Sequence, residues 1–389
     1  MEAFLRAAIA RLGLNPAEQD FITANAITSF DALHELLAAS PSLAGTLRRA
    51  ALLEGLLGAG GEMLSPAYRA ALARPPAPYI PSGALYQRPP MPQPGGGVGE
   101  PGDGPGEAEE PPPADWPRRG KPISLAGERS LDLLGDLAGR WPVRDQGSTP
   151  TCVGFAAATA LERFHTPAGR VPEPLSALFL YRAMRQAMAK DRSRRPPGAA
   201  QGATKLTMAA RLLPGSGICP EAAWPDQTPI DRNPGLRAQR AARPMAADCW
   251  DLGTLTYRWN GAARAVWNLL ADGRPVAVSL PQFRDRDSGP QDPTNWQLPR
   301  TLSRGLVPDR LANWVPAPVG HAVCILGFQP VPEERLGGWF VFRNSLGLDF
   351  AREAPDAMAR KDPRVPEQGY GLISASHIER HVYEIFAPR

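Results

Sequence analysis

The sequence lacks cysteine pairs with CxxC spacing, long apolar runs and any dense cluster of basic residues. Its four cysteines include no CxxC pair, which argues against a zinc site, and we expect neither a metal nor a cofactor. No stretch approaches about 18 apolar residues, so we expect no membrane-spanning helix. Charged residues interrupt the N-terminal segment, so we expect no signal peptide. These absences favour a cytoplasmic protein with reduced thiols.

Lysine is also scarce. Only Lys121, Lys190, Lys205 and Lys361 are present, and arginine supplies the rest of the positive charge behind a net charge of +4. The densest basic run is "KDRSRR" at 190–195, which is typical of a solvated face, so we expect neither a nucleic-acid nor a membrane partner. Apolar residues make up 43% of the 389 positions, enough for a sizeable core, and the length predicts two or three domains.

Proline and glycine are concentrated in one segment that divides the chain. Residues 74–120 contain 14 prolines and 9 glycines, and such a segment buries too little apolar surface to offset its ordering entropy. We expect a disordered linker there. Residues 1–73 have the periodicity of short amphipathic helices, which predicts a small all-α bundle. Residues 121–389 then form a separate mixed domain.

Within the mixed domain, helical patterns come first and strand patterns follow. This order indicates an α+β fold rather than an alternating α/β fold. The expected helices are 152–165, 175–189, 202–213 and 261–273, and the expected strands are 251–259, 274–281, 321–328, 337–345 and 369–374.

The stretch "WPVRDQGSTPTCVGFA" at 141–156 raises the question of what Cys152 does. An isolated cysteine is usually a buried packing residue. Here the turn-forming run "GSTP" precedes it, so Cys152 falls at a helix N-terminus, where the helix dipole favours a thiolate. Gln146 lies six residues upstream and can direct a side-chain amide toward the same place as an oxyanion donor.

A thiolate nucleophile needs a base and a group that orients the base. Of five histidines, His321 stands immediately before an apolar strand in "VGHAVCILGF". Asn344 ends the next apolar run, "WFVFRNS", one hairpin away, where it can orient the imidazole or serve only as a turn residue. His377 and His381 occupy a polar stretch near the C-terminus.

The blocks "VRDQGSTPTCVGFA", "GHAVCILGF" and "FVFRNSLG", in that order, resemble the three signature blocks of papain-like cysteine peptidases. The segment "GATKLTMAARLLPGSGICPEAAWP" is similar to bacterial members, and the resemblance covers about 125–389. It implies a helical lobe that carries the cysteine and a β-barrel-like lobe that carries the histidine and asparagine, with the active site between them.

The resemblance also implies residue roles. Cys152 would attack the scissile carbonyl, His321 would carry the proton, and Asn344 would orient the imidazole. Gln146 and the backbone N–H of Cys152 would hold the oxyanion, and Gly202 would bind extended substrate through its backbone.

Three positions depart from the family pattern. Thr149 replaces a cysteine that is disulfide-bonded in secreted members, Val153 replaces an aromatic residue, and Leu346 replaces the tryptophan that shields the His–Asn bond. Leucine excludes water less broadly, so activity could be lower. The remaining cysteines, Cys219, Cys249 and Cys324, are expected to be packing residues.

The hypothesis is therefore a bacterial cysteine endopeptidase that acts on polypeptides. For residues 1–73 we consider two roles: an inhibitory propeptide, and an adaptor that binds a protein partner in bacterial defence or signalling. We favour the adaptor, because a 47-residue linker holds a propeptide poorly in a cleft. The alternatives for the catalytic domain are an inactive papain-fold scaffold and an acyl transferase.

Overall fold

The computed structural model describes most of the chain outside the linker. The described residues are 2–24, 27, 29–38, 47–61, 63–66, 69, 72, 84–85, 123–137, 139–190, 202–252, 261–287, 293–310, 313–332, 334–353 and 367–389. Of the expected linker 74–120, only the short strand at 84–85 is among them.

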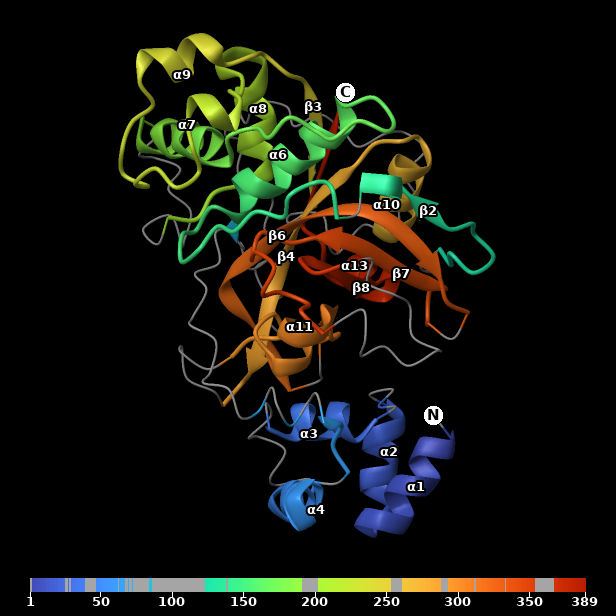
Figure 1. Ribbon diagram of the computed structural model, residues 1–389. Coiled ribbons are helices and arrows are strands. Elements are labelled where there is room, and N and C mark those ends of the chain that lie inside the picture. Colours follow the sequence, from blue (N-terminus) through green and yellow to red (C-terminus); the bar gives the residue numbers. More distant parts are fainter. Residues whose placement is uncertain are drawn as a thin grey trace, which may run out of the picture.

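The N-terminal region forms the predicted helices. They are α1 (Glu2–Leu12), α2 (Pro16–Ala24), α3 (Phe30–Ala38) and α4 (Arg49–Gly61). Their apolar faces share one core, in which the buried leucines of α3 meet those of α4. Figure 1 shows these helices together at one end of the molecule.

The helical lobe consists of α6 (Cys152–Phe164), α7 (Ala177–Lys190), α8 (Leu206–Ser216) and α9 (Leu236–Ala241) (Figure 1). Helix α6 is the central element, because every residue from Cys152 to Glu162 is buried. Gly154 allows α7 to approach closely: a Cβ there would lie 2.5 Å from the carbonyl oxygen of Ala177. The predicted helices 152–165, 175–189 and 202–213 are confirmed with small shifts at their ends.

The sheet lobe is one extended sheet. Its strands lie in the order β3-β9-β4-β6-β7-β8-β5, and all neighbouring pairs on this path are antiparallel except β5 with β8. The helices of this lobe are α10 (Ala262–Ala271), α11 (Pro299–Arg304) and α13 (Ala375–His381). The fold is α+β, as predicted. The strands are β2 (Leu131–Asp132), β3 (Ala247–Asp251), β4 (Val276–Asp285), β5 (Leu306–Val307), β6 (Trp314–Pro330), β7 (Gly338–Arg343), β8 (Tyr370–Ser374) and β9 (Glu384–Pro388).

Two strand predictions need comment. Strand β6 begins at Trp314, so His321 lies within a long strand rather than just before one. Its first half, "WVPAPVG", contains two prolines and a glycine, which disfavour a strand by sequence rules, but it pairs with the end of β4 beyond a bulge. Most of the predicted strand 251–259 falls outside the described residues, and β3 ends at Asp251.

A short linker strand, β1 (Ala84–Leu85), joins the sheet beside His321. It pairs antiparallel with Gly320 and Val319 of β6. Strand β4 already occupies one edge of β6 at this level, through the pair of Gly320 with Pro281. The linker backbone therefore lies along the opposite edge, the one from which β7 leads to Asn344.

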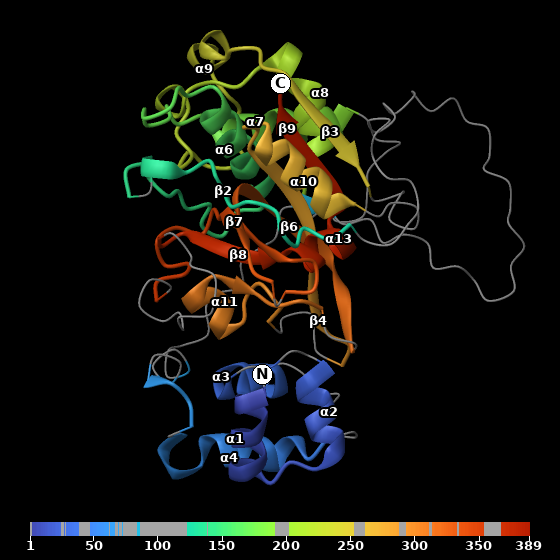
Figure 2. The same cartoon turned by 90° about the vertical axis from the view of Figure 1, so that its right-hand side faces the viewer.

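The helical bundle is packed against the sheet lobe through α3. The apolar core of the bundle continues into Phe283, Leu298 and Trp314 of the sheet lobe. Figure 2 shows α3 directly facing α11. At this contact, Arg304 forms an ion pair with Asp31 at 3.3 Å. The described helices of the N-terminal bundle are therefore seated on the sheet lobe.

Glu35 is a buried carboxyl at this interface. Its Oε1 accepts a hydrogen bond from the backbone N–H of Arg300 at 2.5 Å, and its side chain is nearly inaccessible. Burial raises the pKa of Glu35 to about 7, although Arg300 and Arg304 oppose the shift. Because the docked pKa exceeds the ordinary value, neutral Glu35 stabilises the contact below about pH 4.5. That contribution is lost as the pH rises through about 7.

We expect the docking of the bundle to weaken as the pH rises from about 4.5 to about 7, and Glu35→Gln to remove this dependence. Glutamine keeps an acceptor for Arg300 but never ionises. The measurement is hydrogen exchange of α3, corrected for the intrinsic rate at each pH. An identical pH slope in the parent protein and the variant would show that Glu35 does not control the contact.

Candidate functional site

His321 and Asn344 form a buried hydrogen-bonded pair. Nε2 of His321 lies 2.9 Å from Oδ1 of Asn344, and the backbone N–H of Ser345 donates to the same Oδ1 at 2.9 Å. Because a donor already faces Oδ1, the oxygen of the amide points toward the imidazole, and Nε2 carries the ring proton. This tautomer leaves Nδ1 of His321 as the basic nitrogen.

Gln146 is joined to this pair through Ser345. Its Oε1 accepts from the Ser345 hydroxyl at 2.5 Å, and its backbone N–H donates to the Ser345 carbonyl at 2.8 Å. The Gln146 Nε2 group donates to the carbonyl of Thr149 at 2.6 Å, which uses one of its two hydrogens. The amide is therefore oriented with its donor end toward the segment that leads into α6.

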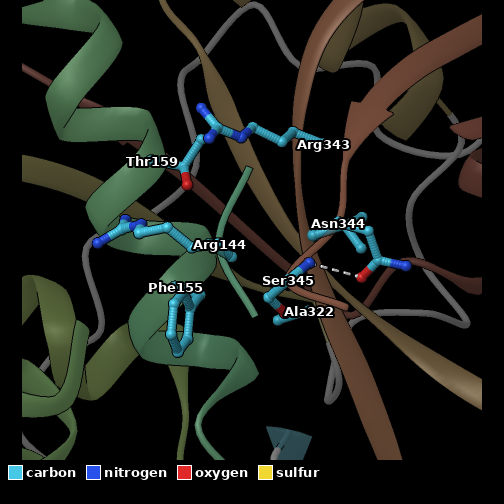
Figure 3. Close-up of a pocket in the computed structure, with 9 residues that line it drawn as sticks. Arg144, Phe155, Thr159, Ala322, Arg343, Asn344 and Ser345 are labelled. Atoms are coloured by element: carbon cyan, nitrogen blue, oxygen red, sulfur yellow. Dashed lines mark hydrogen bonds between the residues drawn. The ribbon is translucent and has the colours of Figure 1, made fainter. Parts of the chain in front are cut away.

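Cys152 is the first residue of α6 and is fully buried. The N-cap residue, Thr151, makes no side-chain hydrogen bond to the helix, so the first backbone N–H groups of α6 have no side-chain acceptor from it. One turn along α6, Phe155 and Ala156 line a small cavity together with Ala322, the residue after His321 (Figure 3). The start of α6 thus lies against the part of β6 that carries His321.

Gly202 lies beside the segment that precedes the nucleophile candidate. Its φ is +90°, and a Cβ would lie 2.6 Å from Pro150 and 3.0 Å from the hydroxyl of Tyr181. Its carbonyl oxygen accepts a hydrogen bond from that hydroxyl at 2.9 Å. Glycine is required here by both conformation and space, and its backbone is held close to the beginning of α6.

Trp296 covers the imidazole, and the sequence did not reveal it. Its ring meets His321 edge to face, with centroids 4.7 Å apart, and it is 2% exposed. The tryptophan expected after Asn344 is replaced by Leu346, which is only half-buried. A tryptophan from the loop after β4 therefore shields the pair. Sequence spacing gave no signal, because Trp296 is distant in the chain from both His321 and Asn344.

The imidazole is withdrawn from water in this arrangement. His321 is 2% exposed, and burial lowers its pKa to about 4, although the hydrogen bond to Asn344 acts in the opposite direction. At neutral pH the ring is therefore neutral. Both Cys152 and His321 are inaccessible, so a substrate cannot reach them until something that covers them moves.

Two arginines flank the site on the side of the helical lobe (Figure 3). Arg144 forms ion pairs with Glu162 of α6 at 2.6 Å and with Asp226 at 3.1 Å. Arg343, the last residue of β7, lies over the ring of Trp141 at 3.9 Å and donates to the carbonyl of Pro142. Together they hold the loop before Gln146 and the end of the strand before Asn344.

The predicted surroundings of the remaining cysteines are confirmed, whereas those of two histidines are not. Cys219 and Cys324 are fully buried and Cys249 is partly buried, in agreement with packing roles. The polar stretch expected around His377 and His381 is instead largely buried, because α13 packs against the sheet. Among the described helices, none has the length and apolar character needed to cross a bilayer.

The chain was compared with protein families, curated proteins and solved structures. No family model and no curated protein matches the chain. Among solved structures, it is similar to xylellain, a cysteine protease from Xylella fastidiosa, at 17% identity over 80% of this chain and 97% of that one, with a TM-score of 0.45. It is also similar to procathepsin B from Trypanosoma congolense, at 14% identity over 79% and 86%, with a TM-score of 0.42.

A third similar structure is the bromelain protease from Ananas comosus, at 15% identity over 67% of this chain and 97% of that one, with a TM-score of 0.38. These structural neighbours are papain-like cysteine proteases, the family that the three sequence blocks resemble. Identities this low do not assign roles to residues of this chain.

We expect Trp296→Ala to raise the pKa of His321 from about 4 toward its ordinary value near 6.5, because water gains access to the ring. An NMR titration of the imidazole measures this shift. Removing a buried tryptophan also costs about 3–5 kcal/mol of stability, so Trp296→Phe, which keeps an aromatic cover, serves as the conservative variant. Trp267→Ala is the matched control on α10. An unchanged His321 pKa in Trp296→Ala would show that another group provides the shield.

Proposed function

We propose that the chain is a cysteine endopeptidase whose catalytic groups are Cys152, His321, Asn344 and Gln146. The observation that carries this proposal is the hydrogen-bond chain that runs from the His321 imidazole through Asn344 and Ser345 to the amide of Gln146, at the segment that leads into α6. It supplies an oriented base, a group that fixes its tautomer, and a directed donor beside a helix-initial cysteine.

In this mechanism, Nδ1 of His321 takes the thiol proton of Cys152. The sulfur then forms a bond to the scissile carbonyl carbon, and the negative charge that develops on the oxygen is held by Gln146 Nε2–H and the backbone N–H of Cys152. When the C–N bond breaks, the imidazolium gives its proton to the leaving amine. Water, deprotonated by His321, then releases the acyl group and restores the thiol.

Gly202 fits the role of a backbone substrate contact in this proposal. It lies beside Pro150 at the approach to α6, in a conformation that leaves its backbone uncovered by any side chain of its own. An extended peptide placed along Gly202 would run past the start of α6. The substrate side chains that the enzyme selects would be set by residues farther from this backbone.

An inactive scaffold and an acyl transferase, the two alternative functions, would need different properties of the same site. An inactive scaffold has no need for an imidazole with a fixed tautomer or for a directed Gln146 amide, so the intact hydrogen-bond chain favours an enzyme. An acyl transferase would use the same acyl-enzyme and differ only in the nucleophile that releases it. A peptide product that incorporates an added amine, detected by mass spectrometry, separates transfer from hydrolysis.

For the N-terminal region we propose recruitment of a protein partner combined with control of access to the site. Through α3 the bundle contacts Arg300 and Arg304 of α11, and this attachment through residues outside the proposed catalytic set suits an adaptor. The linker strand β1, in contrast, lies on the free edge of β6 next to His321, where an extended peptide would add to the sheet. A partner that displaces the bundle would also pull on this strand.

The central test is Cys152→Ala, for which we expect peptide hydrolysis to fall by roughly 10³-fold or more, because the other groups alone give only residual catalysis. When the parent protein opens to admit a ligand, a thiol-directed epoxide should label Cys152, which the site would activate. It should spare Cys219 and Cys324, because burial raises the pKa of both thiols and keeps them protonated. Peptide mapping by mass spectrometry locates the label. Hydrolysis that survives Cys152→Ala, with a folded protein, would overturn the proposal.

The second test concerns β1. We expect Ala84→Pro combined with Leu85→Pro to raise the rate of peptide hydrolysis and of epoxide labelling, because proline lacks the N–H that a sheet partner donates. Prolines introduced at Gly96 and Val98, elsewhere in the linker, are the control. Equal labelling rates in both variants and the parent would show that β1 does not restrict access, while leaving the Cys152 proposal intact.

A further inference from the structure

Three side chains of the types that bind metals, Asp309, His377 and His381, converge in the sheet lobe. His377 and His381 are one turn apart on α13 and share a face of that helix. Asp309, which follows β5, lies against them. Its Oδ1 is 3.4 Å from Nδ1 of His377 and 3.5 Å from Nε2 of His381. The three ligand atoms lie within 4.8 Å of one another.

The two histidines have polar atoms that the described protein leaves without hydrogen bonds. His377 is fully buried, and neither of its ring nitrogens has a hydrogen-bond partner; Nε2 of His381 has none either. Buried polar atoms without partners are destabilising, and native proteins contain few of them.

We propose that Asp309, His377 and His381 form a zinc site. Zn²⁺ bonds to nitrogen and carboxylate oxygen at about 2.0–2.1 Å in tetrahedral geometry, which places neighbouring ligand atoms roughly 3.3–3.4 Å apart. The separations of 3.4 and 3.5 Å from Asp309 Oδ1 to the two histidine nitrogens fit two edges of such a tetrahedron. Two imidazoles and one carboxylate suit Zn²⁺, with water as the fourth ligand.

The surroundings support this ligand set and also limit its affinity. Arg380 binds Oδ2 of Asp309, which leaves Oδ1 for a metal and makes the carboxylate a single-atom ligand. The ring of Phe283 lies edge to face with both histidines and forms an apolar wall. The positive charges of Arg380 and of Arg310, which lies over Phe283, oppose cation binding. We therefore expect weaker binding than at a structural site with four protein ligands.

Such a site would fasten α13 to the segment after β5. Phe283, which touches both histidines, also belongs to the apolar cluster that continues into the helical bundle. A bound metal would therefore stiffen the surface on which the bundle is seated. This role is independent of the proposed peptidase activity, because it uses none of the residues assigned to it.

The test uses the full chain with Cys152→Ser, so that the active-site thiol cannot bind metal, after treatment with a chelator. Titration with Co²⁺ should give the visible absorption of a four-coordinate nitrogen and oxygen site, and one equivalent of Zn²⁺ should abolish it. Zn²⁺ should also raise the unfolding temperature in proportion to its binding. The absence of both effects overturns the proposal.

Variants locate the binding. Asp309→Asn and His381→Gln should each weaken Zn²⁺ affinity at least tenfold, measured by calorimetry, whereas His165→Gln on the helical lobe should leave it unchanged. Asp309 is partly exposed, so Asp309→Asn carries the test if circular dichroism shows that His381→Gln does not fold. Equal affinity in all three variants would place the metal elsewhere and overturn the assignment.

Discussion

The orientation of the candidate site depends on Ser345. Its backbone N–H fixes the oxygen of Asn344 toward His321, its hydroxyl fixes the oxygen of Gln146, and its carbonyl accepts the backbone N–H of Gln146. One residue therefore sets both the tautomer of His321 and the orientation of the Gln146 amide. Because the Gln146 segment leads into α6 and Ser345 follows β7, these bonds also join the two lobes at the site.

Buried arginine and carboxylate side chains stabilise this contact between the two lobes. Arg144 is held by Glu162 and Asp226, while Arg343 is held by the face of Trp141 and a backbone carbonyl. Burial lowers the pKa of Arg343 and raises that of Glu162, yet opposite charges close by act in the opposite direction. Removing one partner would leave an uncompensated buried charge, so these groups fix the spacing of the lobes more than they add net stability.

The sequence was most informative where chemistry depends on local spacing. The helix start at Cys152, the hairpin that ends at Asn344 and the α+β order all follow from periodicity and turn residues. The shield of Trp296 could not be predicted, because no motif links this loop residue to His321. His377 and His381 have the spacing of one helical turn, but their neighbour Asp309 is distant in the chain, so the cluster could not be predicted either. The first half of β6 was missed because its prolines and glycine disfavour a strand, and only pairing with β4 overrides them.

The burial of His321 and its basicity are coupled in this structure. A general base works best when its pKa lies near the working pH, but burial holds the pKa of His321 at about 4. While Trp296 covers the buried imidazole, its lowered pKa makes it a weak base at neutral pH. Any movement that admits a peptide also admits water, which raises the pKa of His321 toward its ordinary value. Opening of the site would then give a peptide access to Cys152 and make His321 a stronger base in the same step. A closed site would lack both the access and the base that peptide hydrolysis needs.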